Sequence, residues 1–85
     1  MYYLYILRCS DDTLYTGIAV DVERRVREHN GSKAGAKYTR GRRPVELVFS
    51  RRFASRSAAS KEEARIKALP REEKLKMLEK KEGER

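Results

Sequence analysis

The amino-acid sequence predicts an α+β domain in which helices flank a three-stranded antiparallel sheet, in the order β-β-α-β-α-α. Three runs rich in aromatic and β-branched residues are typical of strands, and three segments repeat apolar residues at helical spacing. An 85-residue chain with 39% hydrophobic residues lies near the lower size limit for folding without disulfides or metals. We therefore expect one domain over residues 1–69, with a last helix over residues 70–85 that packs on it or extends from it.

Residues 2–9 are predicted to form the central strand, because apolar side chains occupy both of its alternating faces. One face is made by Tyr3, Tyr5 and Leu7 and the other by Tyr2, Leu4 and Ile6. Residues 10–13 favour a turn, so residues 14–18 should return as an antiparallel partner. Tyr5 and Tyr15 can share a face only if the connection has an odd number of residues or a bulge. We predict one of these two arrangements.

The second strand contains Gly17, and a missing side chain in a strand usually marks a bulge or the close approach of another group. Asp21 is a suitable N-cap for a following helix, which Gly31 could end in the left-handed C′ conformation. Arg25 and His29 fall on the inward stripe of this helix. An unpaired buried guanidinium is costly, so Arg25 either reaches a carboxylate at the rim of the core or has a functional role.

Residues 32–44 are expected to form a loop, and loops of this length usually bind something or move. Its cations and one aromatic residue suit phosphate contact and base stacking, although Tyr38 could equally lean back onto the sheet. The candidate nucleic-acid-binding residues are Lys33, Lys37, Tyr38, Arg40, Arg42 and Arg43. Residues 45–53 are predicted to form the third strand. Its expected faces are Val45, Leu47 and Phe49 on one side and Val48 on the other.

Two helices are predicted after the third strand. Ser55 or Ser57 should cap the first, which runs to about residue 68, and Pro70 should stand at the first position of the second. The residues expected to face the core are Ala59, Ile66 and Leu69 in the first helix and Leu75 and Leu78 in the second. This arrangement would place both helices against the sheet.

The formal net charge of +8 is concentrated in one part of the chain. From Lys33 to Arg56 there are eight basic residues and one acidic residue, Glu46. A block of one sign favours a polyanion partner whose phosphates give affinity rather than sequence choice. The alternative is a basic surface that serves only solubility.

The single cysteine, Cys9, excludes an intramolecular disulfide and is expected to be a small buried hydrophobe at a strand end. One cysteine and one histidine also leave no structural zinc site. The sequence shows neither a membrane-length apolar run nor the features of a signal peptide, so we expect a cytoplasmic protein.

Three elements of the sequence together resemble the signature of the GIY-YIG nuclease superfamily. They are Tyr3-Leu4-Tyr5 in the first strand, Tyr15-Thr16-Gly17 in the second, and Arg25 eight residues after the glycine. The chain is most similar to the small stand-alone bacterial and archaeal members, an uncharacterised UPF0213-like group, over about residues 2–69. The resemblance implies an endonuclease that uses a divalent metal to hydrolyse DNA, selects structure rather than sequence, and acts in DNA repair or recombination.

The same resemblance assigns roles to residues of this chain. Tyr5 and Tyr15 match the motif tyrosines, one of which would be the general base. Arg25 matches the arginine that clamps a phosphate oxygen, and Gly17 would make room for the substrate backbone. His29 would orient the substrate or shuttle a proton, or would be a satisfied core histidine.

The metal ligand implied by the resemblance is a glutamate on the helix after the third strand. Glu63 is preferred by its spacing to Ile66, and Glu62 is the alternate. One carboxylate would hold Mg²⁺ or Mn²⁺ weakly, so that the protein alone could be metal-free. The expected partner is DNA, with RNA as an alternative, and a protein partner could supply specificity.

Two other classes of function are compatible with the sequence. The same fold could hold nucleic acid without cutting it, or the last helix could dock a partner in a structural or adaptor protein. A pure binder would have no need for the carboxylate of Glu63, which repels phosphate unless a metal intervenes. The complete set of motif residues therefore favours the enzyme.

Overall fold

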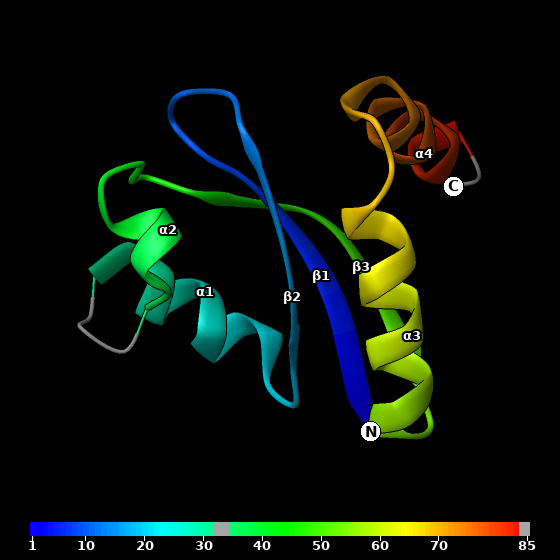
Figure 1. The fold of residues 1–85 in the computed structure, drawn as a ribbon. Coiled ribbons are helices and arrows are strands. Elements are labelled where there is room, and N and C mark those ends of the chain that lie inside the picture. The colour runs from blue at the N-terminus through cyan, green and yellow to red at the C-terminus, as the bar shows by residue number, and fades with distance from the viewer. Residues whose placement is uncertain (32–34, 84–85) are drawn as a thin grey trace.

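The computed structural model describes residues 1–31 and 35–83, with side chains up to residue 78. Its elements are β1 (Tyr2–Arg8), β2 (Leu14–Ala19), α1 (Val22–Gly31), α2 (Lys37–Arg40), β3 (Glu46–Phe53), α3 (Arg56–Lys67) and α4 (Arg71–Gly83). Figure 1 shows α1 and α2 on one side of the sheet and α3 and α4 on the other. Within the described ranges, no helix is long and apolar enough to cross a membrane.

The predicted fold class is confirmed, because the three strands form an antiparallel sheet in the order β2-β1-β3. The central strand is β1, as its two apolar faces predicted. On one face, Leu4 and Ile6 are buried with Ile66 of α3 and Leu78 of α4. On the other face, a second cluster contains Tyr5, Leu7, Cys9 and Val45, against which Val22 and Val26 of α1 pack.

The connection between β1 and β2 has an odd number of residues, as predicted from the requirement that Tyr5 and Tyr15 share one face of the sheet. Arg8 pairs with Leu14, which leaves five residues between the paired strands. Tyr5 pairs with Gly17, and Tyr15 lies two residues before Gly17 on the same face. The centroids of the two tyrosine rings are consequently 6.4 Å apart.

A register shift in β3 contradicts the predicted alternation of this strand. Phe49 pairs with Ile6, but Leu47 pairs with Leu7, so Val48 is an additional residue that has no partner in β1. Such a β-bulge reverses the inward and outward sides of a strand at that point. The three residues predicted to share one face are therefore divided, with Phe49 on the side of α3 and Val45 and Leu47 on the side of α1.

The helix starts agree with the predicted caps. Asp21 Oδ1 accepts a hydrogen bond from the backbone N–H of Arg24 at 3.1 Å, and Ser55 Oγ accepts one from the N–H of Ala58 at 3.1 Å. The left-handed C′ position predicted for Gly31 is wrong, since Gly31 is the last residue of α1 and no described glycine has a positive φ. Helix α4 begins at Arg71, one residue after the predicted Pro70.

The side chain of Asn30 ties the end of α1 to the segment that enters β3. Its amide nitrogen donates to the carbonyl oxygen of Val45 at 3.0 Å, and its amide oxygen accepts from the N–H of Val45 at 2.7 Å. The segment between them was predicted to be a loop throughout, but it contains the short helix α2. This segment is therefore anchored against α1.

Helix α4 contributes a buried side chain to the hydrophobic core. Leu78 is 5% exposed and lies in the cluster of Leu4, Ile6 and Ile66, with Leu75 and Met77 partly buried beside it. We propose that the helix over residues 70–85 packs on the domain of residues 1–69 and completes its core.

Candidate active site

The ring of Tyr5 lies over Gly17 on the neighbouring strand. A Cβ atom built on Gly17 would lie 2.6 Å from the hydroxyl oxygen of Tyr5 and 2.7 Å from its Cζ. The close approach predicted at Gly17 therefore exists, and the ring of Tyr5 makes it. The glycine lets the phenol of the central strand reach across β2.

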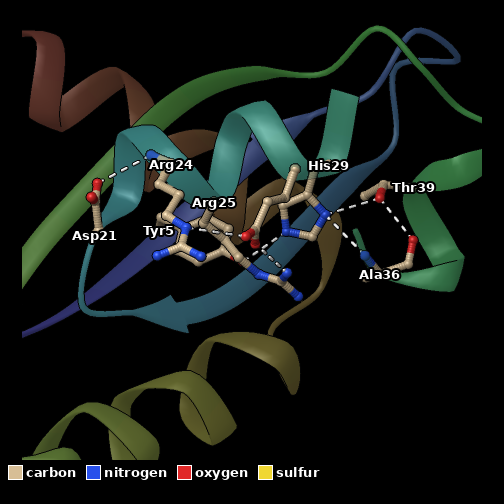
Figure 2. A network of polar contacts seen from close by, with 8 residues as sticks. Tyr5, Asp21, Arg24, Arg25, His29, Ala36 and Thr39 are labelled. Atoms are coloured by element: carbon tan, nitrogen blue, oxygen red, sulfur yellow. Dashed lines mark hydrogen bonds and ion pairs between the residues drawn. The ribbon is translucent and has the colours of Figure 1, made fainter. Parts of the chain in front are cut away.

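The hydroxyl of Tyr5 contacts His29 of α1 inside the protein. Tyr5 Oη lies 2.9 Å from His29 Nε2, and the two residues are 1% and 0% exposed. The other ring nitrogen, Nδ1, lies 2.9 Å from Thr39 Oγ1 and 3.2 Å from the backbone nitrogen of Ala36. Figure 2 shows Tyr5 and His29 side by side below α1, with Thr39 of α2 and Ala36, the residue before α2, on the other side of the imidazole. Burial and the charge of Arg25 lower the pKa of His29.

Arg25 lies beside this pair and is both paired and partly exposed. Its Nη1 donates to Glu28 Oε1 at 2.9 Å, and its side chain also hydrogen-bonds to Tyr5. The side chain of Arg25 is 29% exposed. The carboxylate partner expected at the rim is therefore Glu28, and the contact with Tyr5 exists in addition.

Burial, followed by the neighbouring Tyr15, raises the pKa of Tyr5 to about 12, although Arg25 acts in the opposite direction. The charge of Glu63 adds to the increase. The phenol of Tyr5 is therefore protonated at neutral pH unless additional positive charge is brought to it.

Aromatic rings continue from this network toward the surface. The ring of Tyr15 lies 5.2 Å from that of His29 and 5.6 Å from that of Tyr38, measured between centroids. Tyr38 thus leans back toward the sheet, but it remains 39% exposed. The guanidinium of Arg42 lies 4.1 Å from the centroid of the Tyr38 ring.

The two candidate metal ligands on α3 have different surroundings. Glu62 accepts two hydrogen bonds from Arg65, at 2.8 and 2.6 Å, and pairs with Arg51 of β3 at 3.6 Å. The hydrogen bonds from Arg65 hold the pKa of Glu62 below its usual value. Glu63 pairs with Lys67 at 3.2 Å, and its negative charge contributes to the raised pKa of Tyr5. Of the two carboxylates, Glu63 is the one whose charge contributes to that raised pKa, as the smallest of its causes.

A divalent cation would find few protein ligands here. Among the described side chains, those of residues 1–31 and 35–78, no group of three or more His, Cys, Asp or Glu could hold a metal. A cation at Glu63 would therefore keep most of its ligands as water or substrate oxygens. This pattern fits Mg²⁺, which is commonly bound through one or two carboxylates and phosphate oxygens.

The cations predicted to bind nucleic acid fall into two groups. Lys37 and Arg40 are exposed on α2. Arg42 is bound within the protein, since its Nε donates to Asp11 Oδ2 at 3.0 Å and its Nη1 donates to the carbonyl of Tyr38 at 2.8 Å. Arg43 Nε donates to the carbonyl of His29 at 2.6 Å. Lys33 lies outside the described residues.

Two residues of the network were missed by sequence reasoning, Glu28 and Thr39. The spacing of Glu28, three residues after Arg25, could have revealed it, since side chains three apart meet on a helix. Thr39 had no local signal, because its contact with His29 depends on how the segment after α1 folds back.

Comparison with known proteins identifies the family of this chain. Residues 1–82 match the family model described as the GIY-YIG catalytic domain. The chain therefore belongs to the GIY-YIG family of nuclease domains, for which nucleic acid is the expected partner and divalent metal the usual cofactor.

Within this family, the chain is similar to UPF0213 proteins. It is 56% identical over 78 residues to one from Haloquadratum walsbyi, covering 92% of this chain and 86% of that protein. It is 50% identical over 78 residues to one from Staphylococcus haemolyticus, covering 92% and 94%.

Two solved structures show the same fold. The solution structure of a UPF0213 protein from Bacillus halodurans has a TM-score of 0.61 at 44% identity and covers 93% of this chain and 84% of that chain. The solution structure of an E. faecalis protein has a TM-score of 0.65 at 43% identity, with coverage of 93% and 83%.

Proposed function

We propose that this protein is an endonuclease that hydrolyses DNA phosphodiester bonds with the help of a divalent metal. The observation that carries the proposal is the position of one hydroxyl. Tyr5 Oη is contacted by His29 Nε2 at 2.9 Å and by Arg25, next to the strand that carries Tyr15. A phenol, a guanidinium and an imidazole drawn from β1 and α1 thus meet at one point.

In this proposal Tyr5 is the general base. Hydrolysis of a phosphodiester requires a group that takes a proton from the attacking water and a cation that holds the phosphate. The water oxygen forms a bond to phosphorus, its proton passes to the phenolate of Tyr5, and the bond from phosphorus to the leaving oxygen breaks. The leaving oxygen then takes a proton from solvent.

Positive charge near Tyr5 is needed to form that phenolate, because the pKa of the phenol is about 12. Arg25 already donates to Tyr5, and its partly exposed guanidinium can also hold a phosphate oxygen. Tyr15 packs between His29 and Tyr38, where it can support the phenol of Tyr5 and meet the substrate at the surface.

Glu63 is the proposed metal ligand. A bound Mg²⁺ or Mn²⁺ would stabilise charge on the leaving oxygen and favour ionisation of groups nearby. Glu63 suits this role because Glu62 is held by two arginines, Arg65 and Arg51. Glu63 pairs with one lysine, Lys67, and its charge contributes to the raised pKa of Tyr5.

The nucleic acid would bind along the exposed side of α2. Lys37 and Arg40 can contact phosphates, and the partly exposed ring of Tyr38 offers a surface for a base. Contacts of this kind select the shape of DNA rather than its sequence, which suits a role in DNA repair or recombination. A protein partner could narrow the choice further.

The experiment that tests the function compares cleavage of labelled nicked, branched, single-stranded and duplex DNA. Purified protein is incubated with Mg²⁺, with Mn²⁺ or with chelator, alongside Arg25→Ala. We expect metal-dependent cleavage of at least one structure, lost in the variant. Binding without cleavage of any substrate would instead support the alternative, a nucleic-acid-binding module on the same fold. Cleavage that persists at the same rate in Arg25→Ala would contradict the role proposed for Arg25 or would come from a contaminating nuclease.

A further inference from the structure

Two groups from the segment after α1 contact the outer nitrogen of His29, Nδ1. The backbone N–H of Ala36 points at Nδ1, with its nitrogen 3.2 Å away, and the hydroxyl of Thr39 lies 2.9 Å from the same atom. Thr39 is 0% exposed, as is His29. Gly35 allows this approach, because a Cβ on it would lie 2.6 Å from the carbonyl oxygen of Glu28 and 2.8 Å from the Cα of His29.

The direction of these hydrogen bonds determines where the imidazole proton lies. A backbone N–H can only donate, so Nδ1 must accept from Ala36 and carries no proton itself. A neutral imidazole then has its proton on Nε2, the nitrogen that faces Tyr5 Oη at 2.9 Å. In this tautomer His29 donates to Tyr5 and cannot accept the proton of the phenol.

Thr39 holds the donor in place. Its hydroxyl donates to the carbonyl of Ala36 at 2.9 Å, and its backbone N–H donates to the same oxygen at 3.0 Å. These two bonds fix the turn that aims the N–H of Ala36 at His29. The hydroxyl carries one hydrogen, so it donates either to the carbonyl of Ala36 or to Nδ1. In the second orientation it is another donor to Nδ1 and favours the same tautomer.

We infer that Thr39 is a positioning residue which, through the backbone of Ala36, keeps His29 as a neutral imidazole that donates from Nε2 to the phenolate of Tyr5. This inference rests on the proposed function only for its effect on cleavage. It assigns His29 the task of stabilising the charged base, rather than that of shuttling a proton.

The first test is the tautomer itself, measured by long-range proton–nitrogen NMR on the whole protein at neutral pH without metal or DNA. We expect a protonated Nε2 and a bare Nδ1 for His29. A protonated Nδ1 would overturn the inference. This measurement needs no activity, so it decides the inference even if the protein cleaves no DNA and the proposed function fails.

The second test uses variants of Thr39. Loss of an outer partner of a metal-bound histidine typically lowers activity by about 10- to 100-fold. By analogy, we expect Thr39→Val to lower kcat by at least about 10-fold with KM little changed. Thr39→Ser should restore most of kcat, since it keeps the hydroxyl. Thr13→Val is the matched control, because the Thr13 hydroxyl donates to Asp11 at 2.6 Å within the hairpin and does not contact His29. Equal kcat for Thr39→Val and the wild type would overturn the inference.

The third test separates a donor from a proton acceptor at position 29. A glutamine amide can donate from the place of Nε2 but cannot carry a proton away. We expect His29→Gln to retain measurable cleavage and His29→Ala to lose it. If both variants are equally inactive although both are folded, His29 acts as the proton acceptor and the inference fails.

Discussion

The ring of Tyr5 occupies the space that a side chain on Gly17 would need, with its hydroxyl oxygen 2.6 Å from the position of the missing Cβ. Tyr5 is 1% exposed and hydrogen-bonded to His29 at 2.9 Å, so its ring has no free direction in which to move. The position of the Tyr5 ring therefore requires glycine at position 17.

Gly17→Ala should consequently disturb both stability and the site. Because inserting a methyl group into a packed core usually costs about 1–3 kcal/mol, we expect the free energy of unfolding to fall by that amount, measured by denaturant titration. Cleavage should be lost as Tyr5 moves. Gly41→Ala is the control, since an added Cβ at Gly41 meets nothing within 4 Å. A Gly17→Ala variant as stable and active as the control would contradict the close packing.

Arg25→Ala is expected to abolish cleavage while leaving salt-dependent binding largely intact, because Arg25 acts on Tyr5 and on one phosphate only. Loss of one preorganised charge at a reacting phosphate typically lowers kcat by about 10²–10³-fold. Arg24→Ala removes the same charge from the same helix, where Arg24 pairs with Glu28 at 3.4 Å, and should retain activity. Equal loss of binding and cleavage in Arg25→Ala would argue against a catalytic role.

Glu63→Gln should remove the response of cleavage to Mg²⁺ and Mn²⁺, measured as rate against metal concentration. Glu62→Gln should keep that response and lose only its pairs with Arg65 and Arg51. Exposed pairs of this kind contribute about 0–1 kcal/mol, so its stability should change little. If Glu62→Gln is the variant that loses the metal response, the assignment of the ligand to Glu63 is wrong.

The stability of the protein should fall as pH drops below the ordinary range of histidine. The folded protein lowers the pKa of His29 from 6.5 through burial and through Arg25. Below pH 6.5 the unfolded chain therefore takes up a proton that the folded chain resists, and stability is lost as pH falls toward the folded value. Unfolding titrations between about pH 7 and 5 should show this loss in the wild type. His29→Gln should show a smaller dependence on pH, and an unchanged one would mean that His29 is not responsible.

Lys37 and Arg40 should set much of the salt dependence of DNA binding. Each lost phosphate contact reduces the slope of log K against log salt by about 0.9, so the double variant Lys37→Ala/Arg40→Ala should reduce it by about twice that amount. Lys76→Ala, an exposed cation of α4, should leave the slope unchanged. Arg42 and Arg43 are less suitable probes, because their side chains also hold the segment around α2 to Asp11 and to the carbonyl of His29. An unchanged slope in the double variant would place α2 outside the binding surface.

Local signals in the sequence predicted much of the fold. The two apolar faces of β1 showed that it is central, the side chains of Asp21 and Ser55 marked helix starts, and the motif tyrosines required the odd connection that the hairpin has. Each of these signals depends on residues close together in the chain or on a simple alternation.

The features that were missed depend on contacts between distant segments. The bulge at Val48 arises from pairing with β1, so the alternation within β3 could not reveal it. Gly17 is needed because the ring of Tyr5 lies over it, and the direction of that ring is not encoded locally. Thr39 reaches His29 only because α2 packs near α1. Helical spacing predicted that Arg25 and His29 share one face of their helix. It could not reveal which cations pair with Glu62 and which with Glu63.

The burial of Leu78 of α4 against Leu4 and Ile6 of β1 has a consequence for biosynthesis. During translation, the first strand leaves the ribosome long before the two helices that contribute Ile66 and Leu78 to this cluster. Its apolar side is therefore partly open to water or to chaperones until α3 and then α4 have emerged from the exit tunnel. The last residue of the cluster to reach its place is Leu78.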